Sequence, residues 1–174
     1  MTKVTDSKVV ESKYFKGDII ITDPCYVCKK DNDDWDKSNF GYNLNRLGIS
    51  NFITTDTLYG DWGCHTFNKD TKEVIGQFCA DAGLVTVCLL DEVLKYNPDF
   101  KQNYMVKRPW CVTIIKDFDG TVSFIQRHIE YEYTSDYIRD DGTVVWKKGD
   151  IGNDVDLIVE GTGNVNFIGT QTSL

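Results

Sequence analysis

The sequence predicts a mainly β protein that folds as an antiparallel sandwich or open barrel with one or two short helices. Three glycine-bearing segments, "DFDG", "DDG" and "EGTGN", each separate short runs rich in β-branched and aromatic residues. An Asp-Gly turn between two such runs is typical of a β-hairpin, and closely spaced hairpins favour a sheet that folds back on itself. With 174 residues, of which 41% are hydrophobic and 13% aromatic, the chain can bury one core.

The chain is expected to begin with a flexible lead-in over residues 1–16, which are polar and interrupted by lysines. A single β-rich domain is expected over residues 17–174. Within it, the β-branched run Ile19–Ile21 predicts a strand, and Pro24 ends that strand. The acidic stretch "KKDNDDWDKSNF" that follows predicts a surface loop.

Short helices are expected near Trp35–Leu47 and Asp91–Tyr96. The second helix is indicated by Asp91 as its N-cap and by Pro98, which closes it. Between these helices, "EVIGQFCADAG" and "LVTVCLL" are separated only by glycine-bearing sequence, which predicts two adjacent strands. The second half of the chain is predicted to fold as hairpins around the three glycine-bearing segments.

The charge of the chain limits its partners. The formal net charge is −8, and the basic residues are scattered, whereas a protein that binds duplex nucleic acid presents clustered Lys and Arg. The same charge would repel an anionic membrane surface. The apolar runs are shorter than the ~20 residues that span a bilayer, and the opening residues lack the apolar segment of a signal peptide. We therefore expect a cytoplasmic protein without a duplex nucleic acid or membrane partner.

The six cysteines are expected to be reduced and mostly buried, because free Cys behaves as a small hydrophobic residue. The "CYVC" segment has the spacing of a metal-binding pair, but a structural zinc site usually brings a second pair. Cys64 and His65 are adjacent, which suits one tetrahedral ion poorly. The sequence predicts no metal and no cofactor.

The first candidate site lies in "TLYGDWGCHTF". If this segment is extended, Tyr59, Asp61 and His65 share one face, while Trp62 and Cys64 share the other, which is expected to face the core. A carboxylate beside an imidazole can orient it and raise its pKa, so the pair can act as an acid and a base. Aromatic residues beside such a pair suit a pocket for a flat ligand.

Three further segments carry candidate ligand-binding residues. Asp23 and Tyr26, in "DPCY", follow a predicted strand, although Asp23 can equally cap the turn. Asp81, in "CADAG", lies between apolar runs and needs a partner, which either a backbone turn or a ligand can supply. Arg127 lies among aromatic residues and is a candidate anion anchor, because guanidinium stacks on rings and pairs with phosphate. The phosphate-binding, dinucleotide-binding, nucleophile-elbow and HExxH motifs do not occur in the chain.

The motifs "TDPCYV", "TLYGDWGCHTF", "GQFCADAGLVTVCLLDEVLKYNP" and "GNVNFIGTQ" resemble an uncharacterised family of small proteins from bacteriophages and Gram-positive bacteria. The resemblance covers most of the chain from Gly17 onward. No reaction is assigned to this family, so the resemblance implies no catalytic residue. What it implies is a setting, in which a phage accessory protein counters host defence by sequestering or destroying a cyclic or ADP-ribose-type signalling nucleotide.

Three functions are compatible with these observations. In the first, a binding module sequesters a small nucleotide-type ligand: rings stack on the base, Asp61 or Asp81 accepts hydrogen bonds from ribose hydroxyls or base amines, and Arg127 pairs with a phosphate. In the second, a phosphodiesterase or related hydrolase uses His65 as general base, oriented by Asp61. In the third, the protein inhibits a host protein through surface contacts. A homo-oligomer is compatible with all three.

Overall fold

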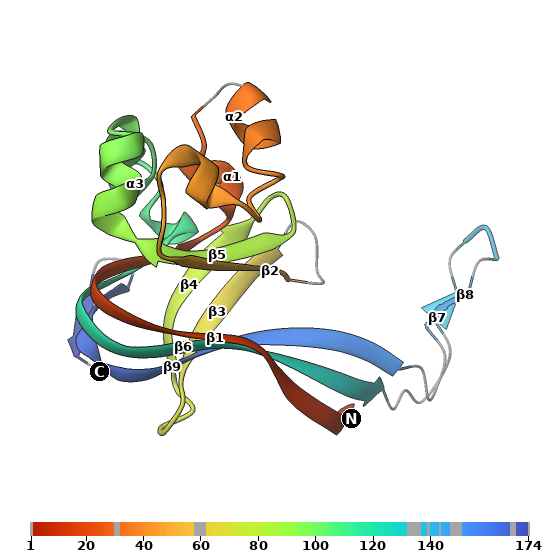
Figure 1. Cartoon of the computed structure of the whole chain (residues 1–174). Helices are drawn as coiled ribbons and strands as arrows, with labels where there is room; N and C mark the ends of the chain where they lie inside the picture. The colour runs from red at the N-terminus through yellow and green to blue at the C-terminus, as the bar shows by residue number, and fades with distance from the viewer. Residues whose placement is uncertain are drawn as a thin grey trace.

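The computed structural model describes residues 2–29, 32–57, 62–131, 137–138, 140–142, 144–146, 151–167 and 170–173. Strands dominate it, as the sequence predicts. The main sheet has the order β2-β5-β1-β6-β9-β3-β4, with β10 paired to β9, and it curls into a half-barrel (Figure 1). The open-barrel form of the prediction is therefore confirmed. The sheet is mixed, because β3 and β9 pair in parallel while the other pairs are antiparallel.

The strands of the main sheet are β1 (Thr2–Thr22), β2 (Phe52–Asp56), β3 (Trp62–Asn68), β4 (Val74–Ala80), β5 (Leu84–Leu89), β6 (Thr113–Tyr131), β9 (Ile151–Phe167) and β10 (Thr170–Ser173). A separate pair is formed by β7 (Tyr137–Ile138) and β8 (Val144–Trp146). The helical elements are α1 (Pro24–Val27), α2 (Asn32–Lys37), the 3-10 helix η1 (Leu44–Leu47), α3 (Leu90–Tyr96), the π-helix η2 (Lys101–Val106) and the 3-10 helix η3 (Pro109–Cys111).

The expected lead-in over residues 1–16 is wrong, because residues 2–16 belong to β1. This strand pairs with β6 from Thr2 opposite Tyr131 to Ile21 opposite Thr113. Strands β1, β6 and β9 form a long ribbon that extends well past the helices (Figure 1). The lysine-rich sequence gave no apolar run to signal a strand. Backbone hydrogen bonds to the neighbouring strand β6 hold these residues in an extended conformation instead.

Two of the three predicted hairpins are also wrong. At "DFDG", β6 continues, and Asp117 takes a positive φ of 53° where the pairing with β9 slips between Lys116 and Asp119. The Asp18 carboxylate accepts a hydrogen bond from the Asp117 N–H at 2.9 Å. The residues that would make a turn therefore make a bulge, which bends a strand without reversing it.

At "EGTGN", β9 also continues, and its glycines serve a close approach between strands. Gly161 lies opposite Gly120 of β6. A Cβ on Gly161 would lie 2.3 Å from the carbonyl oxygen of Asp119, and one on Gly120 would lie 2.2 Å from that of Glu160. Only glycine fits on both sides of this contact.

The "DDG" hairpin is confirmed, since β7 and β8 pair across it with Ile138 opposite Val144. The predicted pairing of "EVIGQFCADAG" with "LVTVCLL" is wrong. These segments are β4, which lies at one edge of the sheet, and β5, which lies between β2 and β1. In the sheet order, β1, β6, β9 and β3 lie between these two strands, although they are consecutive in sequence.

Both predicted helical regions contain helix. Residues 35–47 hold the end of α2 and all of η1, and α3 matches the second region, although its N-cap is Leu89 and Asp91 lies in its first turn. The sequence did not predict α1, η2 or η3. In α1, Pro24 begins a helix as its first residue, a position where the missing N–H costs nothing.

Two apolar clusters hold the fold together. Ile19 and Ile21 of β1 face the cluster inside the curled sheet, and Ile20 faces the cluster beneath the helices. This alternation follows from the period of two in a strand. The helices gather over one face of the sheet (Figure 1), and that second cluster includes Val27 of α1 and Val93 of α3. Among the residues that the structure describes, no helix is long and apolar enough to cross a membrane.

Candidate functional site: a tyrosine-lined groove

A buried carboxylate joins the two motifs "DPCY" and "CADAG". Asp23 is fully buried and is the N-cap of α1, where one carboxylate oxygen accepts a hydrogen bond from the Cys25 N–H at 2.8 Å. The other oxygen accepts from the N–H groups of Asp81 and Ala82, both at 2.8 Å. Burial raises the pKa of Asp23, and the backbone N–H donors oppose this shift. Asp23 therefore fixes the turn between β4 and β5 to the start of α1.

Tyr26, on the helix that Asp23 caps, forms the centre of an aromatic stack. Its ring lies 4.6 Å from that of Tyr104 with an interplanar angle of 29°, and Tyr104 stacks in turn on Phe100 at 5.3 Å. Burial raises the pKa of Tyr26, and the nearby Asp81 side chain raises it further. The Tyr26 hydroxyl is therefore protonated at neutral pH and can act as a hydrogen-bond donor.

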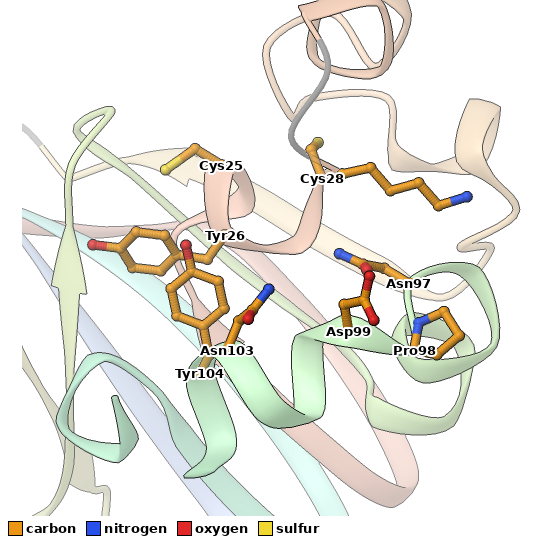
Figure 2. Close-up of a pocket in the computed structure, with 9 residues that line it drawn as sticks. Cys25, Tyr26, Cys28, Asn97, Pro98, Asp99, Asn103 and Tyr104 are labelled. Atoms are coloured by element: carbon orange, nitrogen blue, oxygen red, sulfur yellow. The ribbon is translucent and has the colours of Figure 1, made fainter. Parts of the chain in front are cut away.

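A cavity of about 480 Å³ opens beside these rings, between α1 and the segment from Asn97 to Tyr104. Figure 2 shows Tyr26 and Tyr104 together at one end of this cavity, and Asn97, Pro98 and Asp99 at the other. Its lining residues are Cys25, Tyr26, Cys28, Lys29, Asn97, Pro98, Asp99, Asn103 and Tyr104. A smaller cavity of about 260 Å³ shares Asn103 and Tyr104 and adds Lys107 and Arg108. We call the two cavities together the tyrosine groove.

The cations along the tyrosine groove contrast with the net charge of −8 of the chain. Lys29 lines the larger cavity, and Lys107 and Arg108 line the smaller one. Burial raises the pKa of the Tyr104 hydroxyl, and the nearby Arg108 guanidinium acts in the opposite direction. The charge of Arg108 therefore reaches the aromatic stack, where it can attract an anionic group of a ligand.

Hydrogen bonds hold the Lys29 end of the groove against α3. The backbone N–H of Lys29 donates to the Tyr96 hydroxyl at 3.0 Å, and its ammonium lies 5.1 Å from the centre of the Tyr96 ring. That hydroxyl donates to the Asp34 carboxylate at 2.5 Å. Segments α1, α2 and α3 are thereby connected around one tyrosine, which gives this end of the groove a defined shape.

The Cys25 thiol, which lines the groove, is not activated. Burial raises the pKa of Cys25, and the Asp23 carboxylate raises it further. The thiolate is the reactive form of cysteine, so Cys25 is a poor nucleophile at neutral pH. None of the six cysteines is in a disulfide. Within the described part of the chain, no group of three or more His, Cys, Asp or Glu side chains is arranged to hold a metal ion.

The first predicted site does not belong to the groove. His65 is exposed on β3, opposite Gln77 of β4, and its ring lies 6.5 Å from that of Phe67 in an edge-on arrangement. The predicted core face is confirmed at Cys64, which packs against the inner cluster, and at Thr66, which is fully buried. Tyr59 and Asp61 lie outside the described residues, as does the side chain of Trp62.

Arg127 lies in β6, where its backbone faces Ser7 of β1 and Asp154 of β9, and its side chain is outside the described part. Of the predicted site residues, the structure thus brings together Asp23, Tyr26 and Asp81. Sequence reasoning missed the residues on η2 and just after it. The signal was the segment "KQNYMVKRPW", in which cations and aromatic residues cluster within an acidic chain.

No family profile, curated protein or solved structure matches this chain.

Proposed function

We propose that the protein is a binding module that captures a small nucleotide-type ligand in the tyrosine groove. The observation that carries this proposal is the stacked pair Tyr26 and Tyr104 at a cavity of about 480 Å³, with cations along the same groove. A cavity of this size falls within the range for small-molecule sites, roughly 300–1,000 Å³.

The aromatic part of the groove suits a nucleobase. Tyrosine rings stack on bases with little loss of conformational entropy, and each base stacked in this way contributes about 1–3 kcal/mol. The side-chain amide of Asn103, which lines both cavities, has donors and an acceptor that match the polar edge of a base. The π-helix η2 places Asn103 and Tyr104 on this wall, and π-helical turns occur frequently at functional sites.

The basic part of the groove suits a phosphate. Lys107 and Arg108 line the smaller cavity, and guanidinium pairs with phosphate through two parallel hydrogen bonds. Because the smaller cavity shares Asn103 and Tyr104 with the larger one, one ligand can place its base at the tyrosines and its phosphate at Arg108. In this role Arg108 replaces Arg127 as the anion anchor expected from the sequence.

The chemistry of the groove favours capture over turnover. Cys25 and Tyr26 both carry raised pKa values, so both stay protonated at neutral pH and neither can accept a proton as a general base. The Asp23 carboxylate already accepts hydrogen bonds from three backbone N–H groups. Counter-defence by a bacteriophage, in a host cytoplasm, is part of this proposal and depends on the motif resemblance alone.

Isothermal titration against nucleoside mono- and diphosphates, cyclic dinucleotides and ADP-ribose tests the proposal. We expect saturable heat with at least one of them, and recovery of the intact ligand after the protein is heat-denatured. Uniform absence of heat would contradict a nucleotide-binding function. A new chromatographic peak after incubation would instead support the hydrolase hypothesis.

Two variants connect any binding to the groove. Tyr104→Ala should weaken binding by about 1–3 kcal/mol, because one stacking surface is lost. The double variant Lys107→Gln/Arg108→Gln should weaken binding of phosphorylated ligands and leave the free nucleoside unaffected. The matched control is Lys72→Gln/Lys95→Gln, which removes the same charge at exposed positions outside the groove. Equal loss in both double variants would mean that net charge, and not the groove, attracts the ligand.

A further inference from the structure

Two cysteines from distant parts of the sequence meet beside the groove. Cys79 is near the end of the edge strand β4, and Cys111 is the last residue of η3. Both belong to the apolar cluster beneath the helices, in which Cys111 is buried and Cys79 is half-buried. The Cys79 thiol donates to the carbonyl oxygen of Trp110, the residue that precedes Cys111, at 3.8 Å.

The two thiols also affect each other. Burial raises the pKa of Cys111, and the neighbouring Cys79 side chain raises it further. The 3.8 Å contact places the Cys79 sulfur beside the peptide bond that leads into Cys111. A disulfide between the two therefore needs little backbone movement, whereas cysteines with distant α-carbons cannot be bridged without it. The other thiol nearby is Cys25, which affects the pKa of Tyr26 together with Cys111.

We propose that Cys79 and Cys111 are a redox-sensitive dithiol that forms a reversible intramolecular disulfide with a low-molecular-weight disulfide as the oxidant. This pair joins β4 to η3, and η3 follows the π-helix that carries Tyr104. The disulfide fixes the end of that segment to the edge of the sheet. The proposal does not depend on the ligand of the groove.

The exchange runs in two steps. The Cys79 thiolate, formed by loss of its proton to solvent, attacks one sulfur of the small disulfide, and the other sulfur leaves as a thiolate that takes up a proton. Cys111 then loses its proton and attacks the Cys79 sulfur of the mixed disulfide, which releases the second small thiol. Two protein thiols are oxidised, and one small disulfide is reduced to two thiols. Cys79 reacts first because it is the more exposed of the pair.

Treatment of the reduced protein with oxidised glutathione, followed by alkylation under denaturing conditions and peptide mapping, tests the proposal. We expect two of the six thiols to escape alkylation, and the Cys79 and Cys111 peptides to be linked to each other. The oxidised protein should melt at a higher temperature than the reduced one, and a reductant should reverse the shift, because a cross-link restricts the unfolded chain.

Single-cysteine variants serve as controls. Cys79→Ser should abolish the link and leave Cys111 open to alkylation, while Cys64→Ser, at a half-buried cysteine of β3, should leave its yield unchanged. Links that involve Cys25, glutathione held on Cys79 without closure onto Cys111, or alkylation of all the thiols would each overturn the proposal. The mapping of the wild-type chain decides the question even if a variant fails to fold.

Discussion

Replacement of Asp23 by alanine tests how the two halves of the candidate site are joined. In the folded protein this fully buried carboxylate accepts three backbone hydrogen bonds, one from Cys25 and two from the turn at Asp81 and Ala82. Alanine removes all three at once. The Cys25 N–H then lies at the start of a helix without its cap, and the turn loses its attachment to that helix.

The magnitude follows from the individual contacts. Loss of an N-cap side chain costs about 1 kcal/mol, and each lost bond to the turn costs about 1–1.5 kcal/mol. The exposed backbone of Asp81 and Ala82 can bind water instead, and removal of a carboxylate whose pKa is raised by burial relieves a desolvation cost. We expect a net loss of about 3 kcal/mol in the free energy of unfolding, a decrease of roughly 6–12 °C in melting temperature for a chain of this length.

Urea denaturation measures the global loss, and amide hydrogen exchange at Asp81 and Ala82 measures the local one. Asp23→Asn should lose less than Asp23→Ala, since the amide oxygen can still cap α1 and no charge is buried. Asp36→Ala, at an exposed position of α2, is the matched control and should change stability by less than about 0.5 kcal/mol. Unchanged stability with unchanged exchange at the turn in Asp23→Ala would refute the assigned role.

Three further changes probe other parts of the molecule. Gly161→Ala should destabilise the protein by about 1–3 kcal/mol in urea denaturation, since its Cβ would lie 2.3 Å from a carbonyl oxygen. The control Gly63→Ala, with nothing within 4 Å of its Cβ, should cost less than about 0.5 kcal/mol. Equal effects of the two substitutions would contradict the close strand contact. His65→Ala should leave both the melting temperature and nucleotide affinity unchanged, and a loss of affinity would move the site to β3. Lys69→Ala should leave the melting temperature nearly unchanged, because its ion pair with Glu160, although only 2.6 Å long, joins side chains that are 57% and 52% exposed. A clear decrease in a thermal melt would show a structural role for the pair.

The sequence by itself determined those features that depend on neighbours in the chain. The β-branched run Ile19–Ile21 favours a strand by its own propensity, and Pro24 ends that strand because it cannot donate to the ladder. The 7-residue helix α3 and the turn at "DDG" likewise depend on a few adjacent residues. The candidate residues stood out for the same reason: Asp23 and Tyr26 follow a predicted strand, and Asp81 lies between apolar runs.

Tertiary structure decided whether a segment with turn-forming residues reverses the chain or continues as a strand. The residues of "DFDG" permit either a turn or a bulge, and pairing on both sides of β6, with the bond from Asp18, selects the bulge. Gly161 permits a turn as well, but here its lack of a side chain leaves room for the close approach of Gly120 on the opposite strand. Local propensity cannot separate these outcomes, because their energies differ through contacts with residues far away in sequence.

The candidate site shows the same division. Composition indicated that aromatic, acidic and basic residues were available, and the motifs located some of them. Only the curl of the sheet and the packing of the helices on it bring Asp23 to the turn at Asp81 and place Tyr26 against Tyr104. A binding site requires side chains from distant segments at fixed separations, and those separations are set by the packing of the whole core, which no short stretch of sequence contains.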